Sequence, residues 1–422
     1  MTRTGARHPY ALSEDAMSAE IESYINSLGR AARAAAGELR KLSTARKNAA
    51  LLEIANALEN AREAIAAANA QDVATAKENG LAPAMVDRLT LTQARFDSMV
   101  QGIRAIAALP DPVGEIIWKR SRPSGIAIEK VREPFGVIAV VFESRPNVFA
   151  DTAALTFKTS NAVILRGGKE AVRSNTALAE AVREGLRRAD APVDAVQFVG
   201  VQDHDAVRAL VRCVEYVDVA IPRGGERLIR AMCEAALIPV LKHYKGTCHI
   251  YVDCKANLPM ALAIIHNAKV QRPSACNAVE CLLVHEKLAP LFLPMARAWA
   301  EGEGVVLHES DQDWTREFLA LEMNVGVVAN VDEAIAHINR YGSHHTDAIV
   351  TDDAEIAAHF RRDVDSAVVC HNASTRFTDG GEFGFGAEIG ISTDKLHARG
   401  PMGLEELTTY KYLLSGDGSI RQ

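Results

Sequence analysis

The chain has 422 residues and little of what marks membrane-spanning or secreted proteins. Its longest apolar run of strand character, Gly136 to Phe142, is far too short to cross a bilayer and is followed by Glu143. The N-terminal stretch has no apolar core behind its basic residues, which argues against a secretory signal. We predict no membrane association and a disordered lead at residues 1–15.

Cysteine is scarce, and the seven residues are scattered and odd in number. This usage is typical of reduced thiols and predicts a cytoplasmic protein. No CxxC pair accompanies Cys248, His249 and Cys254, and alternation along a strand would send Cys248 and His249 to opposite faces. We therefore interpret these three residues as structural and predict no metal site.

Neither sign of charge is in large excess, since 47 basic residues stand against 54 acidic ones and the formal net charge is −7. This balance argues against non-specific binding of nucleic acid, while local basic clusters could still hold a small anion. Hydrophobic residues make up 48% of the chain, enough for a large core. The length predicts two or three domains.

The helical and strand patterns divide the chain. Residues 16–108 are rich in alanine and helical in period, and a connector with prolines and glycines follows at 111–125. Beyond it, short β-rich runs alternate with helical stretches in two blocks that begin near residues 136 and 248. Continuous hydrophobicity in strands that are joined by helices predicts parallel sheets buried on both faces. The fold class is therefore α/β, with two parallel-sheet domains.

Potentially reactive side chains are most concentrated in residues 267–280, NAKVQRPSACNAVE. Cys276 follows a helix and a proline-containing turn and precedes a strand, a position where sites are commonly built. Ser274 offers a nearby hydroxyl group, and Lys269 and Arg272 could lower a thiol pKa that is ordinarily about 8.5. The alternative is a small buried core residue. The local sequence supports the two interpretations of Cys276 equally.

Two Gly-Gly turns, each between a strand and a helix, are candidate anion sites. Backbone N–H groups and the helix dipole converge at such turns, and two cations in the first turn favour a ribose 2′-phosphate. The alternative is a tight turn that merely requires glycine, and the chain has neither GxGxxG nor GxxxxGK. The residues concerned are Arg166, Gly167, Gly168 and Lys169 in RGGKE, and Gly224 and Gly225 in PRGGERL.

Two further segments are candidates for function. In ESRPNV, residues 143–148, Asn147 is a candidate donor to a developing oxyanion and Arg145 a candidate for binding a carboxylate or phosphate. A proline-determined turn is the alternative. Residues 373–403 form a long, glycine-rich stretch with aromatic side chains, which predicts an ordered functional loop.

Taken in order, these segments resemble the gamma-glutamyl phosphate reductases, a branch of the aldehyde dehydrogenase superfamily. The resemblance runs from about residue 20 to the C-terminus and implies an aldehyde-dehydrogenase-like fold: two Rossmann-like domains and a small β flap for oligomerisation. It also implies NADPH-dependent reduction of L-glutamyl 5-phosphate to L-glutamate 5-semialdehyde with release of phosphate, the second step of proline biosynthesis. The stretches that carry it are VREPFGVIAVVFESRPNV, KTSNAVILRGGKE, IPRGGERL, CHIYVD, NAKVQRPSACN, SHHTDAIVT and NASTRFTDGGEFGFGAEIGISTDKLHARGPMGLEELTTYKY.

The resemblance assigns roles to single residues. Cys276 matches the family's nucleophile and would carry the acyl group as a thioester, with Asn147 as oxyanion donor. The residues expected to contact NADPH are Arg166, Gly167, Gly168, Lys169, Gly224, Gly225 and Glu317. Glu317 falls near the sequence position of the glutamate that binds the nicotinamide ribose in the superfamily. The residues expected to hold the substrate's phosphate and amino-acid end are Arg272, Ser274, Asn372, Ser374, Arg376 and Arg399.

One departure from the superfamily separates two enzyme hypotheses. Hydrolytic aldehyde dehydrogenases keep a glutamate that activates water, and the matching stretch here, LKHYKGTCH at 241–249, has no acid. A thioester that must be reduced is better protected from hydrolysis when no such base activates water beside it. The alternatives are a hydrolytic NAD(P)-dependent aldehyde dehydrogenase and, outside enzymes, a cysteine-bearing binding protein on the same fold.

The resemblance also implies a division of the chain and its partners. We expect an NADP-binding domain at 16–245 with flap strands at about 116–134, a catalytic domain at 246–390, and a C-terminal return with an oligomerisation strand at 391–422. Segments 124–134 and 407–416 would form the contacts of a homo-oligomer. A separate glutamate 5-kinase would supply the small-molecule substrate, and its physical association with this protein stays open.

Overall fold

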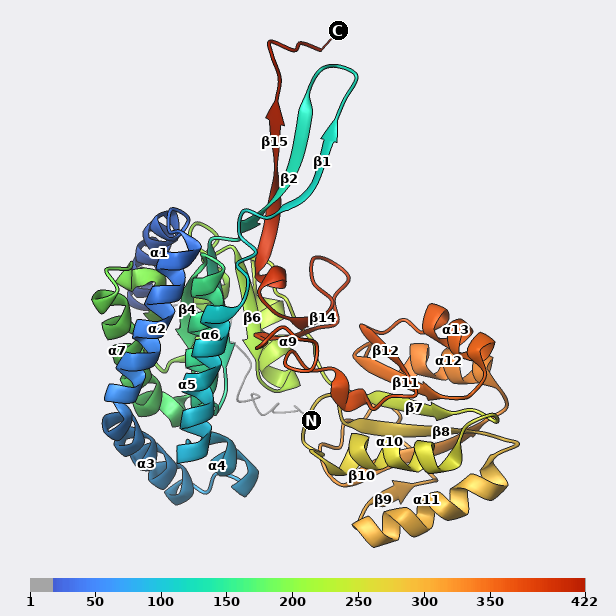
Figure 1. Ribbon diagram of the computed structural model, residues 1–422. Helices are drawn as coiled ribbons and strands as arrows, with labels where there is room; N and C mark the ends of the chain where they lie inside the picture. The colour runs from blue at the N-terminus through green and yellow to red at the C-terminus, as the bar shows by residue number, and fades with distance from the viewer. Residues whose placement is uncertain (1–17, 422) are drawn as a thin grey trace, which may run out of the picture. The chain divides into compact units, whose positions relative to one another are not determined.

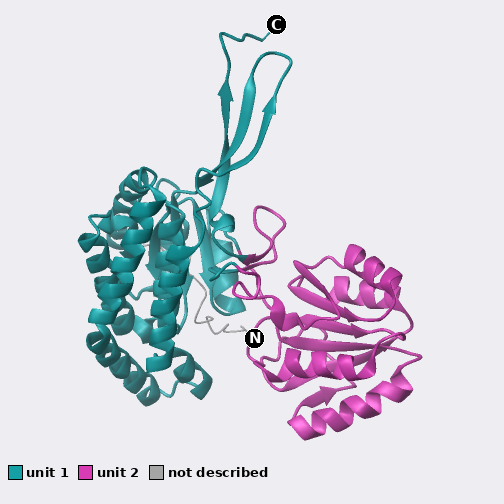
Figure 2. Cartoon of the chain, in the orientation of Figure 1, with its two compact units in different colours: residues 1–241, 385–390, 402–422 teal, residues 242–384, 391–401 magenta. Residues whose placement is uncertain are grey.

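The computed structural model describes residues 18–421, which form two compact units (Figures 1 and 2). Unit 1 comprises residues 1–241, 385–390 and 402–422, and unit 2 comprises residues 242–384 and 391–401. The disordered lead predicted at 1–15 lies outside the described residues.

The division differs from the one that the sequence predicts. The predicted boundaries follow residues 245 and 390, whereas the chain passes from one unit to the other after residues 241, 384, 390 and 401. Hydrophobic periodicity identifies strands and helices but does not say which unit a short returning segment joins. For that reason the predicted catalytic domain ends too late and the predicted C-terminal return omits the excursion of 391–401 into unit 2.

The N-terminal part of unit 1 is helical, as its alanine-rich composition predicts. Side-chain oxygens cap two of the helices: Ser43 accepts from the N–H of Arg46, and Thr92 accepts from the N–H of Arg95. Pro83 stands at the start of a third, where its missing N–H costs nothing. The helices are α1 (Ala19–Leu39), α2 (Thr44–Asn60), α3 (Arg62–Glu78), α4 (Pro83–Leu89) and α5 (Gln93–Ala108).

A parallel four-stranded sheet follows in unit 1, in the order β5-β4-β3-β6. Every residue of β3 and β4 is buried, which explains their continuous hydrophobicity and confirms the predicted α/β class. The strands are β3 (Val137–Phe142), β4 (Ala162–Arg166), β5 (Val196–Phe198) and β6 (Val219–Arg223), and the connecting helices are α6 (Pro146–Lys158), α7 (Val172–Arg188), α8 (His204–Val211) and α9 (Glu226–Ala235).

This strand order is that of a Rossmann half-sheet, in which the order reverses beside the first strand. The reversal lies between β3 and β6, so the loops that follow these two strands flank the usual place for a ligand. These loops begin with Glu143 and Gly224, in the two segments that the sequence singles out.

The flap of unit 1 is a three-stranded antiparallel sheet, seen at the top of Figure 1. It consists of β1 (Ile116–Ser121), β2 (Ala127–Pro134) and β15 (Thr408–Ser415), with β2 in the middle. Lys130 of β2 lies opposite Trp118 and Tyr412, whose rings are 5.7 Å apart between centroids. The flap strands predicted at about 116–134 and the C-terminal strand thus share one sheet.

Unit 2 is built on a six-stranded, wholly parallel sheet in the order β12-β11-β7-β8-β10-β9. Apolar side chains of α10 and α11 pack on one face of this sheet, and those of α12 and α13 pack on the other. The strands are β7 (Cys248–Val252), β8 (Val279–His285), β9 (Val306–His308), β10 (Glu322–Val328), β11 (Thr346–Val350) and β12 (Val368–His371), and the helices are α10 (Leu258–Val270), α11 (Ala289–Glu303), α12 (Val331–Tyr341) and α13 (Ala354–Asp363).

The glycine-rich stretch at 373–403 is ordered, with little regular structure. It contains a short 3-10 helix, Thr375–Phe377, and the two strands β13 (Gly390–Ser392) and β14 (Gly400–Met402), which pair with each other.

Among the described residues, no helix combines the length and apolar character that crossing a membrane requires.

A buried ion pair joins the helical layer of unit 1 to the connector. Lys47 Nζ lies 2.5 Å from Asp111 Oδ2 and donates to Ser160 Oγ at 3.0 Å. Lys47→Met would leave the Asp111 carboxylate buried without its cation, which costs about 3–5 kcal/mol. We therefore expect the midpoint of thermal unfolding to fall by roughly 10 °C.

Lys41→Met is the matched control, because Lys41 pairs with Glu38 on the surface and such pairs contribute about 1 kcal/mol or less. Differential scanning calorimetry of both variants checks the prediction. Equal midpoints for the two would mean that the buried pair does not stabilise unit 1.

Candidate active site

Cys276 lies in a tight loop between α10 and β8, as its sequence position predicts. The loop contains two turns, with Ala275 N–H donating to Arg272 O at 3.1 Å and Ala278 N–H to Ala275 O at 3.0 Å. The Cys276 side chain is half-buried, and the loop residues Arg272 and Ser274 are exposed. A thiol so placed is accessible, unlike the fully buried Cys248 and Cys281.

A buried ion pair closes the base of this loop. Lys269, at the end of α10, lies with its Nζ 3.0 Å from Glu280 Oε2 at the start of β8, and neither side chain is exposed. Glu280 also accepts from the backbone N–H groups of Phe318 and Leu319, each at 3.3 Å. Lys269 therefore anchors the loop, because a buried lysine requires a counter-charge and finds Glu280. The predicted influence of Lys269 on the Cys276 thiol stays a prediction.

The acid-free segment 241–249 lies against the nucleophile loop through its glycine. A Cβ added to Gly246 would overlap the Cys276 carbonyl and lie 2.7 Å from the Cys276 Cα. The buried Cys248 thiol donates to the same carbonyl, at 3.3 Å. The Gly246 N–H in turn donates to Glu317 Oε1 at 2.8 Å, which brings this predicted cofactor residue beside the loop.

Two imidazole groups also lie close to Cys276. The potential metal-ligating atoms of His243, Cys276 and His345 are all within 4.8 Å of one another, and the two rings meet edge to face with centroids 5.6 Å apart. Sequence reasoning missed both histidines, because they lie 33 and 69 positions from Cys276 and only the pairing of β7, β8 and β11 brings them together. The one available signal is that each lies on the amino-terminal side of a strand of the same sheet, His243 before β7 and His345 directly before β11.

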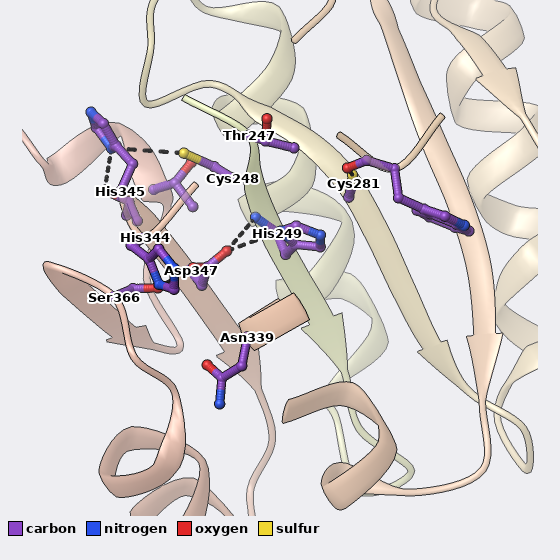
Figure 3. Close-up of polar contacts among 12 residues, drawn as sticks. Thr247, Cys248, His249, Cys281, Asn339, His344, His345, Asp347 and Ser366 are labelled. Carbon is purple, nitrogen blue, oxygen red and sulfur yellow. Dashed lines mark hydrogen bonds and ion pairs between the residues drawn. The ribbon is translucent and has the colours of Figure 1, made fainter. Parts of the chain in front are cut away.

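The neighbouring residues Cys248 and His249 have different partners, as Figure 3 shows. Cys248 Sγ lies 3.8 Å from His345 Nδ1, whereas His249 donates its backbone N–H to Asp347 Oδ1 at 2.7 Å. In the part of the chain that the structure describes, no group of three potential metal ligands contains both residues.

Arg376 belongs to the same neighbourhood. Its guanidinium donates to Asn277 Oδ1, next to the nucleophile, and its Nε donates to Gln271 Oε1 at 2.9 Å. Burial and the nearby Arg272 guanidinium lower the pKa of Arg376. Two of the predicted substrate-binding cations, Arg272 and Arg376, thus lie near each other and near Cys276.

The remaining predicted substrate residues have other visible contacts. The Asn372 side-chain amide accepts a hydrogen bond from the backbone N–H of Thr351 and donates one to its C=O, both at 3.0 Å. That contact lies at the carboxyl ends of β11 and β12, whereas Cys276 precedes the amino end of β8. Ser374 Oγ accepts from the N–H of Arg376 at 3.2 Å, and Arg399 pairs with Asp365 at 2.8 Å.

The cofactor candidates of unit 1 surround the carboxyl ends of its strands. Arg166 is buried and donates to Gly167 O at 3.0 Å and to Gln202 O at 3.2 Å, while Lys169 is exposed. The helix after RGGKE begins only at Val172, because a short 3-10 turn covers Lys169–Ala171.

Two carboxylates occupy the Gly-Gly turns, which the sequence did not suggest. Glu143 Oε2 accepts from the Gly225 N–H at 3.0 Å, and a Cβ added to Gly224 would lie 2.7 Å from the Glu143 carboxyl carbon. Burial raises the pKa of Glu143, while the Gly225 N–H opposes this. Glu170 of the RGGKE turn accepts from the Ser144 N–H at 2.9 Å, in the ESRPNV segment. The Gly225 N–H is therefore oriented toward negative charge, as the anion-site hypothesis requires of the PRGGERL turn.

Asn147, the predicted oxyanion donor, lies in the first turn of α6 in unit 1. Its Nδ2 donates to Asp151 Oδ2 at 3.1 Å. Burial raises the pKa of Asp151 to about 6, and the Asn147 amide partly offsets this.

The chain is similar to several known proteins. The sequence model of the aldehyde dehydrogenase family matches residues 13–302. A gamma-glutamyl phosphate reductase from Moorella thermoacetica is 50% identical over 412 residues, which is 94% of this chain and 99% of the relative. The crystal structure of gamma-glutamyl phosphate reductase from Thermotoga maritima has a TM-score of 0.92 at 43% identity and covers 94% of this chain and 100% of its own.

A more distant structure shows the same fold. It is an engineered glycolyl-CoA reductase with bound NADP⁺, with a TM-score of 0.69 at 13% identity over 92% of this chain and 96% of its own. The matched family, the close relatives and the shared fold lead to one conclusion: the chain belongs to the aldehyde dehydrogenase family.

Proposed function

We propose that this protein reduces L-glutamyl 5-phosphate to L-glutamate 5-semialdehyde and releases phosphate, with Cys276 carrying the glutamyl group as a thioester. The overall reaction follows from the relatives: the chain is an oxidoreductase that acts on glutamyl phosphate, a small molecule of proline biosynthesis. The observation that carries the role of Cys276 is its half-buried thiol in a loop that Lys269–Glu280 and Gly246 hold in place beside two arginines.

The cations near Cys276 support the first chemical step. Arg272 and Arg376 attract the anionic substrate, and the Cys276 sulfur attacks the acyl carbon and expels phosphate. Phosphate is a good leaving group and needs no strong acid. We propose that Arg272, Arg376 and Ser274 bind the charged ends of the substrate, with Ser374 and Arg399 ordering the loop around them. Asn372 is not part of this group, because it bonds Thr351 at the carboxyl ends of β11 and β12.

The second step requires a hydride at the thioester carbon, which a bound nicotinamide cofactor supplies. Members of the aldehyde dehydrogenase family bind such cofactors. The alkoxide that forms collapses to the aldehyde and returns the Cys276 thiolate. Donors for this alkoxide are proposed to be backbone N–H groups and Asn147. Without a carboxylate in 241–249, water is not activated against the thioester, which disfavours the hydrolytic alternative.

The Gly-Gly turns of unit 1 support a dinucleotide site. Gly224 lies so close to the Glu143 carboxyl group that no Cβ fits there, and the Gly225 N–H donates to the same carboxylate. We propose that Gly167, Gly168, Gly224 and Gly225 receive the phosphates, and that Glu317 binds the nicotinamide ribose. Arg166 and Lys169 favour NADPH over NADH, with the exposed Lys169 as the residue that contacts the 2′-phosphate.

We also propose a cytoplasmic homo-oligomer. The flap leaves β1 and β15 as open edges, and Tyr410, Tyr412 and Leu414 on β15 are exposed. Exposed apolar groups on an open edge are typical of surfaces that pair with another chain. Because an acyl phosphate is labile, transfer from an associated glutamate 5-kinase would protect it.

The role of Cys276 is tested in the reverse direction with glutamate semialdehyde, NADP⁺ and phosphate, by nicotinamide absorbance. We expect Cys276→Ala to lose at least about 10³-fold in kcat, because no other group can hold the acyl intermediate. Cys254→Ser, a second half-buried thiol, should keep wild-type turnover. Turnover that survives in Cys276→Ala overturns the mechanism.

Gly246→Ala tests the contact that positions the nucleophile. Its Cβ would displace the Cys276 backbone, and a shift of about 1 Å at a reacting group lowers kcat by roughly 100-fold. Gly302→Ala is the control, since its Cβ meets nothing within 4 Å. Steady-state kinetics and circular dichroism compare the two, and full activity in Gly246→Ala would show that the loop tolerates the shift.

Lys169→Ala tests the cofactor preference. Loss of one charge-assisted bond to the 2′-phosphate should lower kcat/KM for NADP⁺ by roughly 10-fold to 100-fold. The value for NAD⁺ should be unchanged, and the exposed Lys77→Ala should change neither. An equal loss with both cofactors would contradict a contact with the 2′-phosphate.

A further inference from the structure

The side chains of His243, Cys276 and His345 form a compact group of two imidazoles and one thiol. Their potential ligand atoms all lie within 4.8 Å of one another. They come from three separate segments of unit 2: the stretch before β7, the loop before β8 and the turn before β11. Two nitrogens and a sulfur are ligands that Zn²⁺ prefers, and three protein ligands with an open fourth position are its usual arrangement in accessible sites.

His243 is held in the tautomer that a metal requires. Its Nδ1 lies 2.9 Å from the backbone carbonyl oxygen of Ile391. A carbonyl oxygen only accepts hydrogen bonds, so Nδ1 carries the proton and Nε2 carries the lone pair.

His345 is held in the same way by a hydroxyl group. Its Nδ1 lies 2.8 Å from Thr346 Oγ1, and this hydroxyl donates to Thr378 Oγ1 at 2.9 Å. Because the Thr346 proton is directed at Thr378, His345 Nδ1 is the donor to Thr346, and Nε2 is the basic nitrogen. An imidazole whose Nδ1–H bonds an oxygen is the usual form of a histidine that binds a metal through Nε2.

We propose that His243, Cys276 and His345 bind Zn²⁺ and that this binding inhibits the enzyme reversibly. Binding forms a sulfur–zinc bond and releases the thiol proton to solvent. Tetrahedral zinc with Zn–N and Zn–S bonds of usual length separates its ligand atoms by roughly 3.3–3.6 Å, which side chains whose ligand atoms lie within 4.8 Å of one another can reach by small rotations. The sulfur lone pair that would attack the acyl carbon is then engaged by the metal.

The surroundings of the group indicate competition between metal and substrate. Arg272 and Arg376 lie near Cys276 and attract anions, which weakens the binding of a cation. Because the acyl carbon of the substrate and Zn²⁺ both require the Cys276 sulfur, the two exclude each other from one site. This inhibitory consequence rests on the proposed role of Cys276, whereas the binding of metal does not.

A second group of similar composition provides a matched control. Asp253, Cys254 and His285 also bring their ligand atoms within 4.8 Å of one another. The Asp253 carboxylate, however, already accepts from Tyr251 Oη at 3.1 Å, Lys255 N–H at 3.1 Å and Thr351 Oγ1 at 2.9 Å. His285 Nδ1 accepts from the Lys287 N–H at 3.1 Å. These groups are occupied by internal hydrogen bonds and are poorer metal ligands.

The first experiment measures binding without turnover. Metal-free protein is titrated with Co²⁺ and followed by the thiolate-to-cobalt charge-transfer absorption, and Zn²⁺ affinity is obtained by displacement. We expect one Co²⁺ per chain in the wild type and in Cys254→Ser, no charge-transfer band in Cys276→Ser, and at least roughly tenfold weaker Zn²⁺ binding in His243→Ala. Wild-type affinity in His243→Ala, or a band that is lost in Cys254→Ser, overturns the proposal.

The second experiment links binding to the thiol. Zn²⁺ should protect Cys276 from iodoacetamide, read by peptide mass spectrometry, and a chelator should restore alkylation. His243→Asn keeps an N–H for the Ile391 carbonyl but offers no imidazole nitrogen, so it should fold and turn over within about twofold of wild type while losing the protection. Protection that persists in His243→Asn contradicts the site. Inactivity of the metal-free wild type would instead argue against the proposed function.

Discussion

The contact between Gly246 and the backbone of Cys276 is the constraint on which the site depends. With no side chain on Gly246, the segment before β7 lies directly on the nucleophile loop. The Gly246 N–H donates to Glu317, and Cys248, the first residue of β7, donates its thiol hydrogen to the Cys276 carbonyl. One close backbone approach therefore decides which groups surround the Cys276 sulfur.

Buried charge holds the other side of the loop. Lys269 and Glu280 join the end of α10 to the start of β8, and Glu280 also holds the segment of Phe318 and Leu319. The loop is thus anchored at both ends while Cys276 stays accessible. In unit 1, Glu143 and Glu170 play a comparable part, since they accept from the backbone N–H groups of Gly225 and Ser144. In both units, carboxylates hold backbone segments in place.

The partners of buried cations cannot be read from the sequence. Cations close in sequence to a candidate site, such as Lys269 and Arg166, are natural candidates for acting on it. The structure gives Lys269 a buried carboxylate and Arg166 two backbone carbonyls, because a buried cation takes the acceptors that the packing supplies. The histidines at 243 and 345 were missed for the complementary reason, since only strand pairing brings them to Cys276.

The local features could be predicted from the sequence: helices from alanine-rich periodicity, buried parallel strands from continuous hydrophobicity, and the loop position of Cys276 between a helix and a strand. These follow from the preferences of neighbouring residues, which a sequence displays directly. Only the tertiary structure decided the boundaries of the two units, the carboxylates at the glycine turns and the imidazoles beside the sulfur. Each of these depends on contacts between residues far apart in the chain, and such contacts arise from packing that no local pattern records.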